Sequence, residues 1–563
     1  MRKIAFIMVA LLGLGFTPRL SAQSYDIGGT VLNNDIVSWQ DIYNLSYTSH
    51  NYGTARSMAM GNAFTALGAD MISASLNPAG VGMYVESDIS LSPMMLFTKS
   101  PTLGGDNYYN AVPRREQTFK ERSNRFAMSS IGGIFTAYRG TGAVTNVNIG
   151  FAYNRIADFN RSYRNASLAN PAEESMANLF CTMSNADNLL TNSDGTMPFG
   201  NDPYFWGAVL AYKNGLTNKD AEGWFIDRIS PAAEIDQYSA VQTRGSLGEY
   251  AFTLGINFAD WLYLGASLGI QSLDYERSTY YGENYIYTPS ARPSGDVMPY
   301  QLDYMNYMQH TELSGTGVNF KIGATIRPVK FLRIGLAYHT PTAYTVAMRY
   351  DAEMWSKTYS AGSNPEGYDI DKDGNMYDDV YTDIWEDSGP YSWDFRSPHR
   401  LMVGAAVTLG SRFILSADYE RSWYQSMRLK SSPINGLSYT ATIKELFKGG
   451  NTVRLGAEAY LLPFLAVRAG YIWSGSTLRD GYRDVIASHP LTKSESYITA
   501  GLGLKLSHTI YLDLAYQYGK TKRTDYKTFY AISDMGEAYD IESRLYNTST
   551  DRHHAVVTLG FRF

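Results

Sequence analysis

The strongest constraint on this chain is an alternation of apolar and polar residues with a period of two, repeated over segments of about ten residues. In TIYLDLAYQYG, Ile510, Leu512 and Leu514 fall on one face and Asp513 on the other. A transmembrane β-strand needs about ten such residues, with its apolar face toward lipid. The charged face must look into a lumen, because a Lys or Arg toward mid-bilayer lipid costs roughly 2–4 kcal/mol. The pattern therefore predicts the strands of a membrane-spanning β-barrel.

About fourteen segments carry this alternation, so we expect an all-β fold, a fourteen-stranded antiparallel transmembrane β-barrel. An even strand number leaves both chain ends on the periplasmic side. The predicted strands are Val85–Thr98, Phe126–Arg139, Ala143–Ala157, Ala240–Phe258, Trp261–Leu273, Thr311–Arg327, Phe331–Tyr350, Arg400–Leu409, Phe413–Met427, Thr452–Leu461, Phe464–Gly475, Tyr497–Ser507, Thr509–Gly519 and His553–Phe563.

The links between these strands alternate strictly between two lengths. Very short links fall near Gly140, Ala259, Pro328, Gly410, Leu462 and Ser507. The other links are long and polar: Lys99–Arg125, Asp158–Ser239, Asp274–His310, Asp351–His399, Arg428–Asn451, Ser476–Ser496 and Lys520–Arg552. Short periplasmic turns and long outer loops are typical of outer-membrane barrels. A soluble β-sandwich, the alternative, has no reason to sort its loops by length.

The first residues, MRKIAFIMVALLGLGFTPRLSAQ, indicate a secretory signal peptide at residues 1–22, with a basic start, a short apolar run and a small-residue cleavage site. An anchor helix is the alternative, but the run is short and Pro18 follows it. Beyond Phe16 no apolar run approaches the roughly 18 residues of a spanning helix. Cys181 is the only cysteine, so no internal disulfide can form.

The composition agrees with a protein of the bacterial outer membrane. In that location we expect membrane lipid and lipopolysaccharide to surround the barrel. Of 563 residues, 45 are tyrosine, whose apolar body and polar tip suit a membrane–water interface. The formal net charge of −6, without a basic block, argues against nucleic acid as a partner. The last strand places Ala555, Val557, Leu559, Phe561 and Phe563 on one face, which resembles the C-terminal signal read by the barrel-insertion machinery.

Residues 23–83 precede the first strand and are too few for an independent domain with a good core. Their Ala and Met residues, with Gly53, Gly61 and Gly68 allowing close turns, favour a plug in the barrel lumen over a disordered periplasmic tail. We therefore divide the mature chain into an N-terminal hatch at 23–83 and a barrel with long extracellular loops at 84–563.

The segment ARSMAMGNAFTALGADMISASLNPAGV, which begins at Ala55, resembles the FadL/TodX family of outer-membrane transporters of hydrophobic compounds. NIGFAYNRIADFNRSY, from Asn148, and RIGLAYHTPTAY, from Arg333, resemble strand segments of that family. The resemblance implies a fourteen-stranded barrel with a hatch inside it, uptake of long-chain fatty acids or other hydrophobic molecules, and no catalytic reaction. It also implies a lateral exit through the wall near the third strand, here near residues 148–157.

The family's hatch motif matches Asn77, Pro78 and Ala79. Pro78 fixes its own φ and pushes Asn77 into an extended conformation, and the Asn77 side chain can bond neighbouring backbone groups. We assign the seating and gating of the hatch to Asn77, Pro78, Ala79, Arg56 and Phe64. The alternative is an ordinary turn into the first strand.

Candidate ligand-binding residues fall into two groups. Lumen-facing cations could hold the carboxylate of an amphiphile: Arg327, Arg333, Arg468 and Lys321. Alternatively, these cations pair with the lumenal carboxylates Asp418, Glu420 and Asp513. In the longest outer loop, the aromatic cluster of Tyr204, Phe205 and Trp206 suits a capture groove for a hydrophobic ligand, and a helical cap that packs on itself is the alternative.

One acidic outer loop partly matches a calcium-binding loop. Asp369, Asp371 and Asp373 fit its first ligand positions, but Val380 stands where a bidentate Glu is expected, so an acidic surface loop is the alternative. No other cofactor is expected, and no nucleophile signature points to an enzyme. Besides a transporter, the sequence leaves open a surface-exposed structural or adhesive barrel, or a narrow polar porin.

Overall fold

The computed structural model describes residues 26–27, 30–33, 39–46, 51–103, 118–187, 206–227, 229, 233–287, 302–358, 375–382, 391–410, 412–430, 443–444, 446–479, 494–522, 524–533 and 541–563. The predicted signal peptide lies outside these residues. Within them, no helix is both long enough and apolar enough to cross a membrane.

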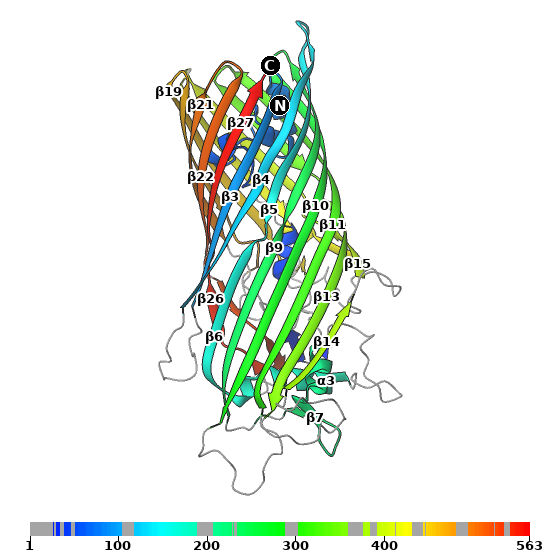
Figure 1. Cartoon of the computed structure of the whole chain (residues 1–563). Coiled ribbons are helices and arrows are strands. Elements are labelled where there is room, and N and C mark those ends of the chain that lie inside the picture. Colours follow the sequence, from blue (N-terminus) through cyan, green and yellow to red (C-terminus); the bar gives the residue numbers. More distant parts are fainter. Residues whose placement is uncertain are drawn as a thin grey trace, which may run out of the picture.

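Fourteen antiparallel strands form a closed barrel, which confirms the predicted fold (Figure 1). Each strand pairs with the next along the wall, and the last strand closes on the first, where Phe561 lies opposite Ile89. The wall strands are β3 (Asp88–Leu103), β4 (Thr118–Arg139), β5 (Val144–Asp158), β9 (Ala233–Phe258), β10 (Leu262–Tyr287), β11 (Leu302–Val329), β12 (Leu332–His339), β16 (Arg400–Leu409), β17 (Phe413–Trp423), β19 (Gly449–Leu462), β20 (Leu465–Ser474), β21 (Glu495–Lys505), β22 (Ile510–Thr521) and β27 (Asp551–Arg562).

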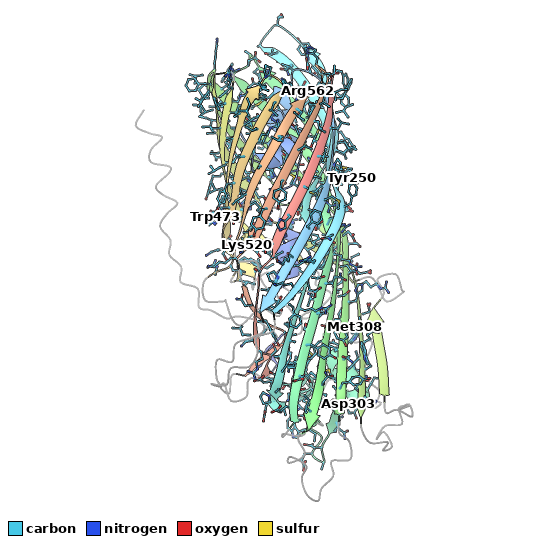
Figure 2. All side chains as sticks on the ribbon, turned by 60° about the vertical axis from the view of Figure 1, so that its left-hand side comes forward. Tyr250, Asp303, Met308, Trp473, Lys520 and Arg562 are labelled. Atoms are coloured by element: carbon cyan, nitrogen blue, oxygen red, sulfur yellow. The ribbon has the colours of Figure 1, made fainter. Side chains whose placement is uncertain are left out.

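A belt of apolar side chains covers the outer surface of the barrel in its half nearer the short turns. On β22, Ile510 and Leu514 are exposed while Asp513 between them is buried. Tyr250 on β9 and Trp473 on β20 belong to the same belt, and each is 42% exposed (Figure 2). A belt of this kind matches the hydrocarbon of a bilayer, so the faces predicted from the alternation are confirmed. The short turns lie at the end that holds the C-terminus (Figure 1).

Several strands continue past this belt at the opposite end of the barrel. β9, β10 and β11 contain 26, 26 and 28 residues, far more than a membrane crossing needs. The wall is lengthened there by β6 (Arg161–Pro171), β13 (Ala343–Thr358), β14 (Asn375–Thr382), β15 (Tyr391–Arg396), β18 (Arg428–Lys430), β23 (Thr524–Lys527) and β26 (Leu545–Thr548). Outward positions become polar, as at Arg244 and Asp274, so this part lies beyond the apolar belt, and we call it the extension.

The extension corrects the loop boundaries expected from the sequence. Much of the predicted loops Lys99–Arg125 and Asp274–His310 is strand, in β3, β4, β10 and β11. The physical reason is that strands above the bilayer face water, so their outer positions lose the apolar residues by which a membrane strand is recognised.

A hydrophobic core fills the extension. It joins Ile42 of α1 (Trp39–Ser46), Phe180 of α3 (Met176–Asp187), Val209 of α4 (Trp206–Lys213) and Tyr307 of β11. The smaller elements are η3 (Ala172–Glu174), η6 (Tyr424–Ser426), the hairpin of β7 (Thr217–Lys219) and β8 (Phe225–Asp227), and a sheet of β1 (Asp26–Ile27), β2 (Thr30–Asn33), β24 (Tyr530–Ser533) and β25 (Ile541–Glu542).

Residues 51–84, which we call the luminal segment, lie inside the barrel and are almost entirely buried. The segment contains α2 (Ala55–Ala59), η1 (Met71–Ala74) and η2 (Pro78–Met83). Each of these short helices begins at a polar residue whose side chain accepts a hydrogen bond from its first turn: Thr54, Asp70 and Asn77. Helices this short are not stable by themselves, and the capping hydrogen bonds help to stabilise them.

Wall glycines let the luminal segment approach the strands at backbone distance. A Cβ atom at Gly265 would lie 2.2 Å from the carbonyl carbon of Pro78, and one at Gly470 would lie 2.3 Å from the backbone nitrogen of Gly61. A Cβ atom would meet the backbone of the segment in the same way at Gly255, Gly335 and Gly456, and would meet its side chains at Gly323, Gly404 and Gly501. The wall and the segment thus fit as two surfaces in direct contact, without an intervening layer of wall side chains at these points.

We expect Gly265→Leu to lower the free energy of unfolding of the barrel by about 1–3 kcal/mol, because the added side chain meets backbone that cannot move aside. Gly142→Leu is the matched control, since a Cβ there meets nothing within 4 Å. Denaturant unfolding of the purified barrels measures both effects. Equal stability of the two variants would contradict the close contact described here.

Candidate functional site: the luminal segment and the wall beside it

Asn77 fixes the bend at which the luminal segment turns toward the wall. Its side-chain oxygen accepts a hydrogen bond from the Ala79 N–H at 3.1 Å, with Pro78 between them as the first residue of η2. Its amide nitrogen donates to the Thr65 carbonyl oxygen and, at 3.3 Å, to the Thr325 hydroxyl on β11. One fully buried side chain therefore joins η2, an earlier loop of the segment and the wall. Its role in gating stays a prediction.

Arg56 and Phe64 belong to a second contact between the segment and the wall. The Arg56 guanidinium lies 5.5 Å from the centre of the Phe64 ring and 2.8 Å from the Glu458 carboxylate on β19. Glu458 also pairs with Arg468 at 2.7 Å, and Arg468 pairs with Asp513 at 2.6 Å. These four charges form one chain of ion pairs, so removing Glu458 would leave Arg56 without its carboxylate, and removing Arg468 would leave Asp513 without its cation.

Wall side chains also hold the backbone of the luminal segment directly. Arg333 donates to the Leu67 carbonyl oxygen at 2.8 Å, and the Thr65 N–H donates to Asp418 at 2.8 Å. Further bonds of this kind come from Ser129, Asn146, Asn148, His339, Ser416, Thr499 and Thr558. The segment is thus attached around the lumen, to β4, β5, β12, β17, β21 and β27.

The predicted carboxylate-binding cations take different positions. Lys321 is buried and pairs with Glu249, while Arg468 pairs with Glu458 and Asp513. Arg333 bonds the luminal segment. Arg327 donates to the Lys330 carbonyl oxygen in the turn after β11. The structure does not bring the four together, and their role toward a ligand stays a prediction.

The predicted capture cluster and calcium loop are described only in part. Trp206 is 2% exposed at the start of α4, and its ring lies 5.5 Å from that of Tyr350. Tyr204 and Phe205 lie outside the described residues, as do the predicted calcium ligands Asp369, Asp371 and Asp373. Trp206 therefore belongs to a packed helical cap, and both predictions stay open.

The wall loses its backbone ladder on one side of β5. β4 pairs with β5 only from Arg139 to Ser130, and the last pair is Ser130 with Asn154. Beyond it, residues 118–128 of β4 pair with β3, whereas the end of β5, from Arg155 to Asp158, and strand β6 pair with β9. Among the described residues no backbone pair joins the two sides. We call this line between β4 and β5–β6 the seam.

Side chains bridge the seam in place of the ladder. Arg155 Nε donates to the Met128 carbonyl oxygen at 3.2 Å, Arg125 donates to Asn160 at 3.0 Å, and Arg164 pairs with Glu121 at 3.0 Å. The seam begins at the level of lipid-exposed residues, since Phe126 on β4 is 64% exposed. It therefore runs from the apolar belt into the extension.

Arg161, which the sequence analysis did not single out, lies at the first residue of β6 beside the seam. Its guanidinium carbon lies 5.0 Å from the centre of the Tyr163 ring, and its Nε atom is buried without a hydrogen-bond partner. Among the described residues no carboxylate forms an ion pair with it, and burial lowers the pKa of Arg161 to about 10. In the sequence, the one signal for Arg161 is its position two residues before Tyr163, which places both side chains on the same, inward face of the strand.

No family model matches the chain, and neither does any curated protein sequence. Among solved structures, it is similar to a Pseudomonas aeruginosa FadL homologue at 13% identity and a TM-score of 0.49, covering 92% of this chain and 98% of that chain. It is similar to the Ralstonia pickettii toluene transporter TbuX at 14% identity and a TM-score of 0.45, covering 92% and 100%. It is similar to the Pseudomonas putida toluene transporter TodX at 12% identity and a TM-score of 0.45, covering 91% and 98%.

The pH dependence of stability tests the buried carboxyl of the luminal segment. Thr54 donates to Asp70 at 2.8 Å and the Ile72 N–H at 3.1 Å, yet burial raises the pKa of Asp70 from 3.8 to about 6. The folded chain thus takes up a proton near pH 6 that the unfolded chain takes up only near pH 4. We expect the barrel to gain at most about 3 kcal/mol from this group as the pH falls from 7 to 4.

Asp70→Asn should remove this gain, because the amide has no proton to take up. The measurement is the free energy of unfolding of wild type and variant at pH 4 and pH 7. If the difference between the two proteins does not change with pH, the pKa of Asp70 is the same in the folded and unfolded chains and our assignment is wrong.

Proposed function

We propose that this chain is an outer-membrane uptake channel for hydrophobic compounds, long-chain fatty acids among them. In this proposal the luminal segment is a hatch that closes the barrel toward the periplasm, with Asn77, Pro78 and Ala79 as its seat. The ligand leaves sideways through the seam into the bilayer. The observation that carries the proposal is the loss of the β4–β5 ladder beside a plugged lumen.

A plugged lumen supports uptake of apolar molecules over a water-filled pore. The luminal segment is buried and bonded to strands around the lumen, and the extension contains a hydrophobic core. A narrow polar porin would need a continuous hydrated path past both. A hydrophobic molecule has a lower free energy in lipid than in water, so passage from the lumen directly into the bilayer avoids the unfavourable step through periplasmic water.

The seam supports lateral exit because it can open without breaking a strand ladder. Inside a bilayer each unpaired backbone group costs several kcal/mol, so an intact ladder does not part. At the seam the bridges are side chains of Arg155, Arg125 and Arg164, which can exchange partners with water or with a ligand. This position agrees with the exit expected near residues 148–157.

Arg161 supports a ligand with an acidic group. A half-buried guanidinium next to an aromatic ring, without an acidic partner among the described residues, offers a carboxylate the charge and donors that it needs. Tyr204, Phe205 and Trp206 remain the proposed capture residues.

Cross-linking the seam tests the exit. In a Cys181→Ser background, Glu121→Cys and Arg164→Cys place two thiols across the seam, where the native side chains form an ion pair at 3.0 Å. We expect a short bismaleimide to reduce the uptake of radiolabelled palmitate by cells toward that of cells lacking the protein, because the seam can no longer part.

The matched control is Ser278→Cys with His310→Cys, which joins two strands across an intact ladder. This cross-link should leave uptake unchanged. Full uptake through the cross-linked seam would exclude lateral exit there. If cells lacking the protein take up palmitate normally, the chain is instead a structural or adhesive barrel.

Arg161→Gln tests the acidic group of the ligand. We expect roughly tenfold weaker binding of palmitate by the purified barrel, since a hydrogen bond to a charged group contributes about 1.5–3 kcal/mol. Binding of toluene, which has no charge, should not change. Arg244→Gln, which changes an outward-facing arginine of the extension away from the seam, is the control. Equal affinities of both variants for palmitate would remove Arg161 from the ligand site.

A further inference from the structure

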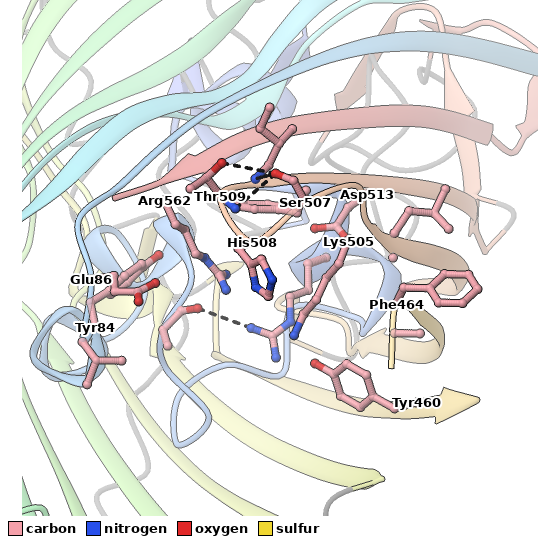
Figure 3. A pocket seen from close by; sticks show the side chains of 18 of the residues that line it. Tyr84, Glu86, Tyr460, Phe464, Lys505, Ser507, His508, Thr509, Asp513 and Arg562 are labelled. Atoms are coloured by element: carbon pink, nitrogen blue, oxygen red, sulfur yellow. Dashed lines mark hydrogen bonds between the residues drawn. The ribbon is translucent and has the colours of Figure 1, made fainter. Parts of the chain in front are cut away.

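A cavity of about 430 Å³ lies at the short-turn end of the barrel, beside the end of the luminal segment. Figure 3 shows side chains that line it. Tyr84 and Glu86, at the end of the luminal segment, form one side of it. The turn that carries Ser507, His508 and Thr509 forms another side. Since short turns face the periplasm in outer-membrane barrels, this cavity opens toward the periplasm.

The chain of ion pairs described above forms part of the cavity lining. Arg468 is 8% exposed and uses its Nε and Nη1 atoms for Glu458 and Asp513, which leaves Nη2 without a hydrogen bond among the described residues. Gly503 makes room for this guanidinium, because a Cβ atom there would lie 2.4 Å from Nη2. Among the described residues Arg562 donates only through Nε, to Asp88, and its guanidinium lies 4.7 Å from the centre of the Tyr511 ring, so its two terminal nitrogens form no hydrogen bond there.

Two further basic side chains line the cavity without a partner. Lys505 and His508 are exposed and form no ion pair among the described residues. Glu86 is the one acidic lining residue outside an ion pair, and it lies on the opposite side, beside Tyr84 (Figure 3). The carboxylates of Glu458, Asp513 and Asp88 offset the charges of the lining arginines Arg56, Arg468 and Arg562. The charges not offset in this way are Lys505 on one side of the cavity and Glu86 on the other.

The cavity also offers apolar surface next to these donors. Tyr460 and Phe464 lie beside Lys505 (Figure 3), and Phe464 is 53% exposed at the rim of the barrel. A volume of this size is that of a small-ligand pocket. Donors without acceptors beside aromatic rings are what an anionic head on an apolar body requires.

We propose that this cavity is a periplasm-facing binding site for an oxyanion, a carboxylate or phosphate, attached to an apolar group. Lys505, His508 and the free guanidinium nitrogens of Arg468 and Arg562 donate to the oxyanion, and Tyr460 and Phe464 contact the apolar group. The site lies beyond the proposed hatch and goes beyond the uptake function. It does not depend on the seam.

The test of the site is the binding of sodium benzoate to the purified barrel in uncharged maltoside micelles. Ligand-observed NMR titration measures this binding. Benzyl alcohol is the neutral probe of similar shape. We expect Lys505→Gln to weaken benzoate binding roughly three- to fivefold, as the loss of one exposed charge pair predicts. Lys505→Arg should retain binding, and Glu86→Gln should strengthen it, because an opposing negative charge is removed.

Lys330→Gln is the matched control, since Lys330 is an exposed lysine in another turn at the same end of the barrel. It should bind benzoate as wild type does. The four variants change exposed side chains that form no ion pair among the described residues, so the fold is retained, and unfolding midpoints check this. Weaker benzoate binding by Lys505→Gln together with stronger binding by Glu86→Gln would support the site. Two substitutions that only disturbed the structure would both weaken binding.

The proposal fails if benzyl alcohol binds as tightly as benzoate, or if Lys505→Gln and Lys330→Gln behave alike. Repeating the titration in phospholipid nanodiscs separates the sources of the oxyanion. Weaker benzoate binding there identifies the lipid phosphate as the occupant, and equal binding identifies a free small molecule. Both outcomes retain the site, and neither depends on palmitate uptake by cells.

Discussion

Hydrocarbon offers no hydrogen bonds to a polypeptide backbone, and the rest of this structure depends on that constraint. It requires the fourteen strands to close, so that β27 pairs with β3 and no edge faces lipid. It also limits where the wall can be interrupted. The β4–β5 ladder ends only where the outer surface turns from apolar to polar, and arginine side chains replace it there. The position of the seam along the barrel is therefore set by the edge of the surrounding bilayer.

The inside of the wall meets a different constraint, because the lumen must hold a folded segment and its charges together. Glycines give the luminal segment its space, and polar side chains of six strands give its backbone partners. Buried charges such as Lys321 and Glu249 are placed in pairs, which is the condition for keeping an ionised group away from water. Arg161 departs from this rule among the described residues, and such a departure is more informative about a ligand than any paired cation.

The fold could be predicted from the sequence because the membrane imposes its pattern residue by residue. Ile510, Asp513 and Leu514 reveal their faces without knowledge of any neighbour. The extension was missed because strands in water lack that apolar face. The site could be predicted only where the chain itself carries the geometry, as at Asn77 and Pro78. Which cation is paired depends on residues far apart in sequence, such as Glu249 and Lys321, and no spacing rule relates them.

The contacts of the luminal segment with both ends of the wall have a consequence for biogenesis. The segment leads directly into β3, and its Ala55 N–H donates to Thr558 on β27 at 2.7 Å. Its backbone also touches glycines of strands between these two. The bond to Thr558 can form only once β27 is in place. The final seating of a segment made at the start of the chain therefore depends on the strand made at its end.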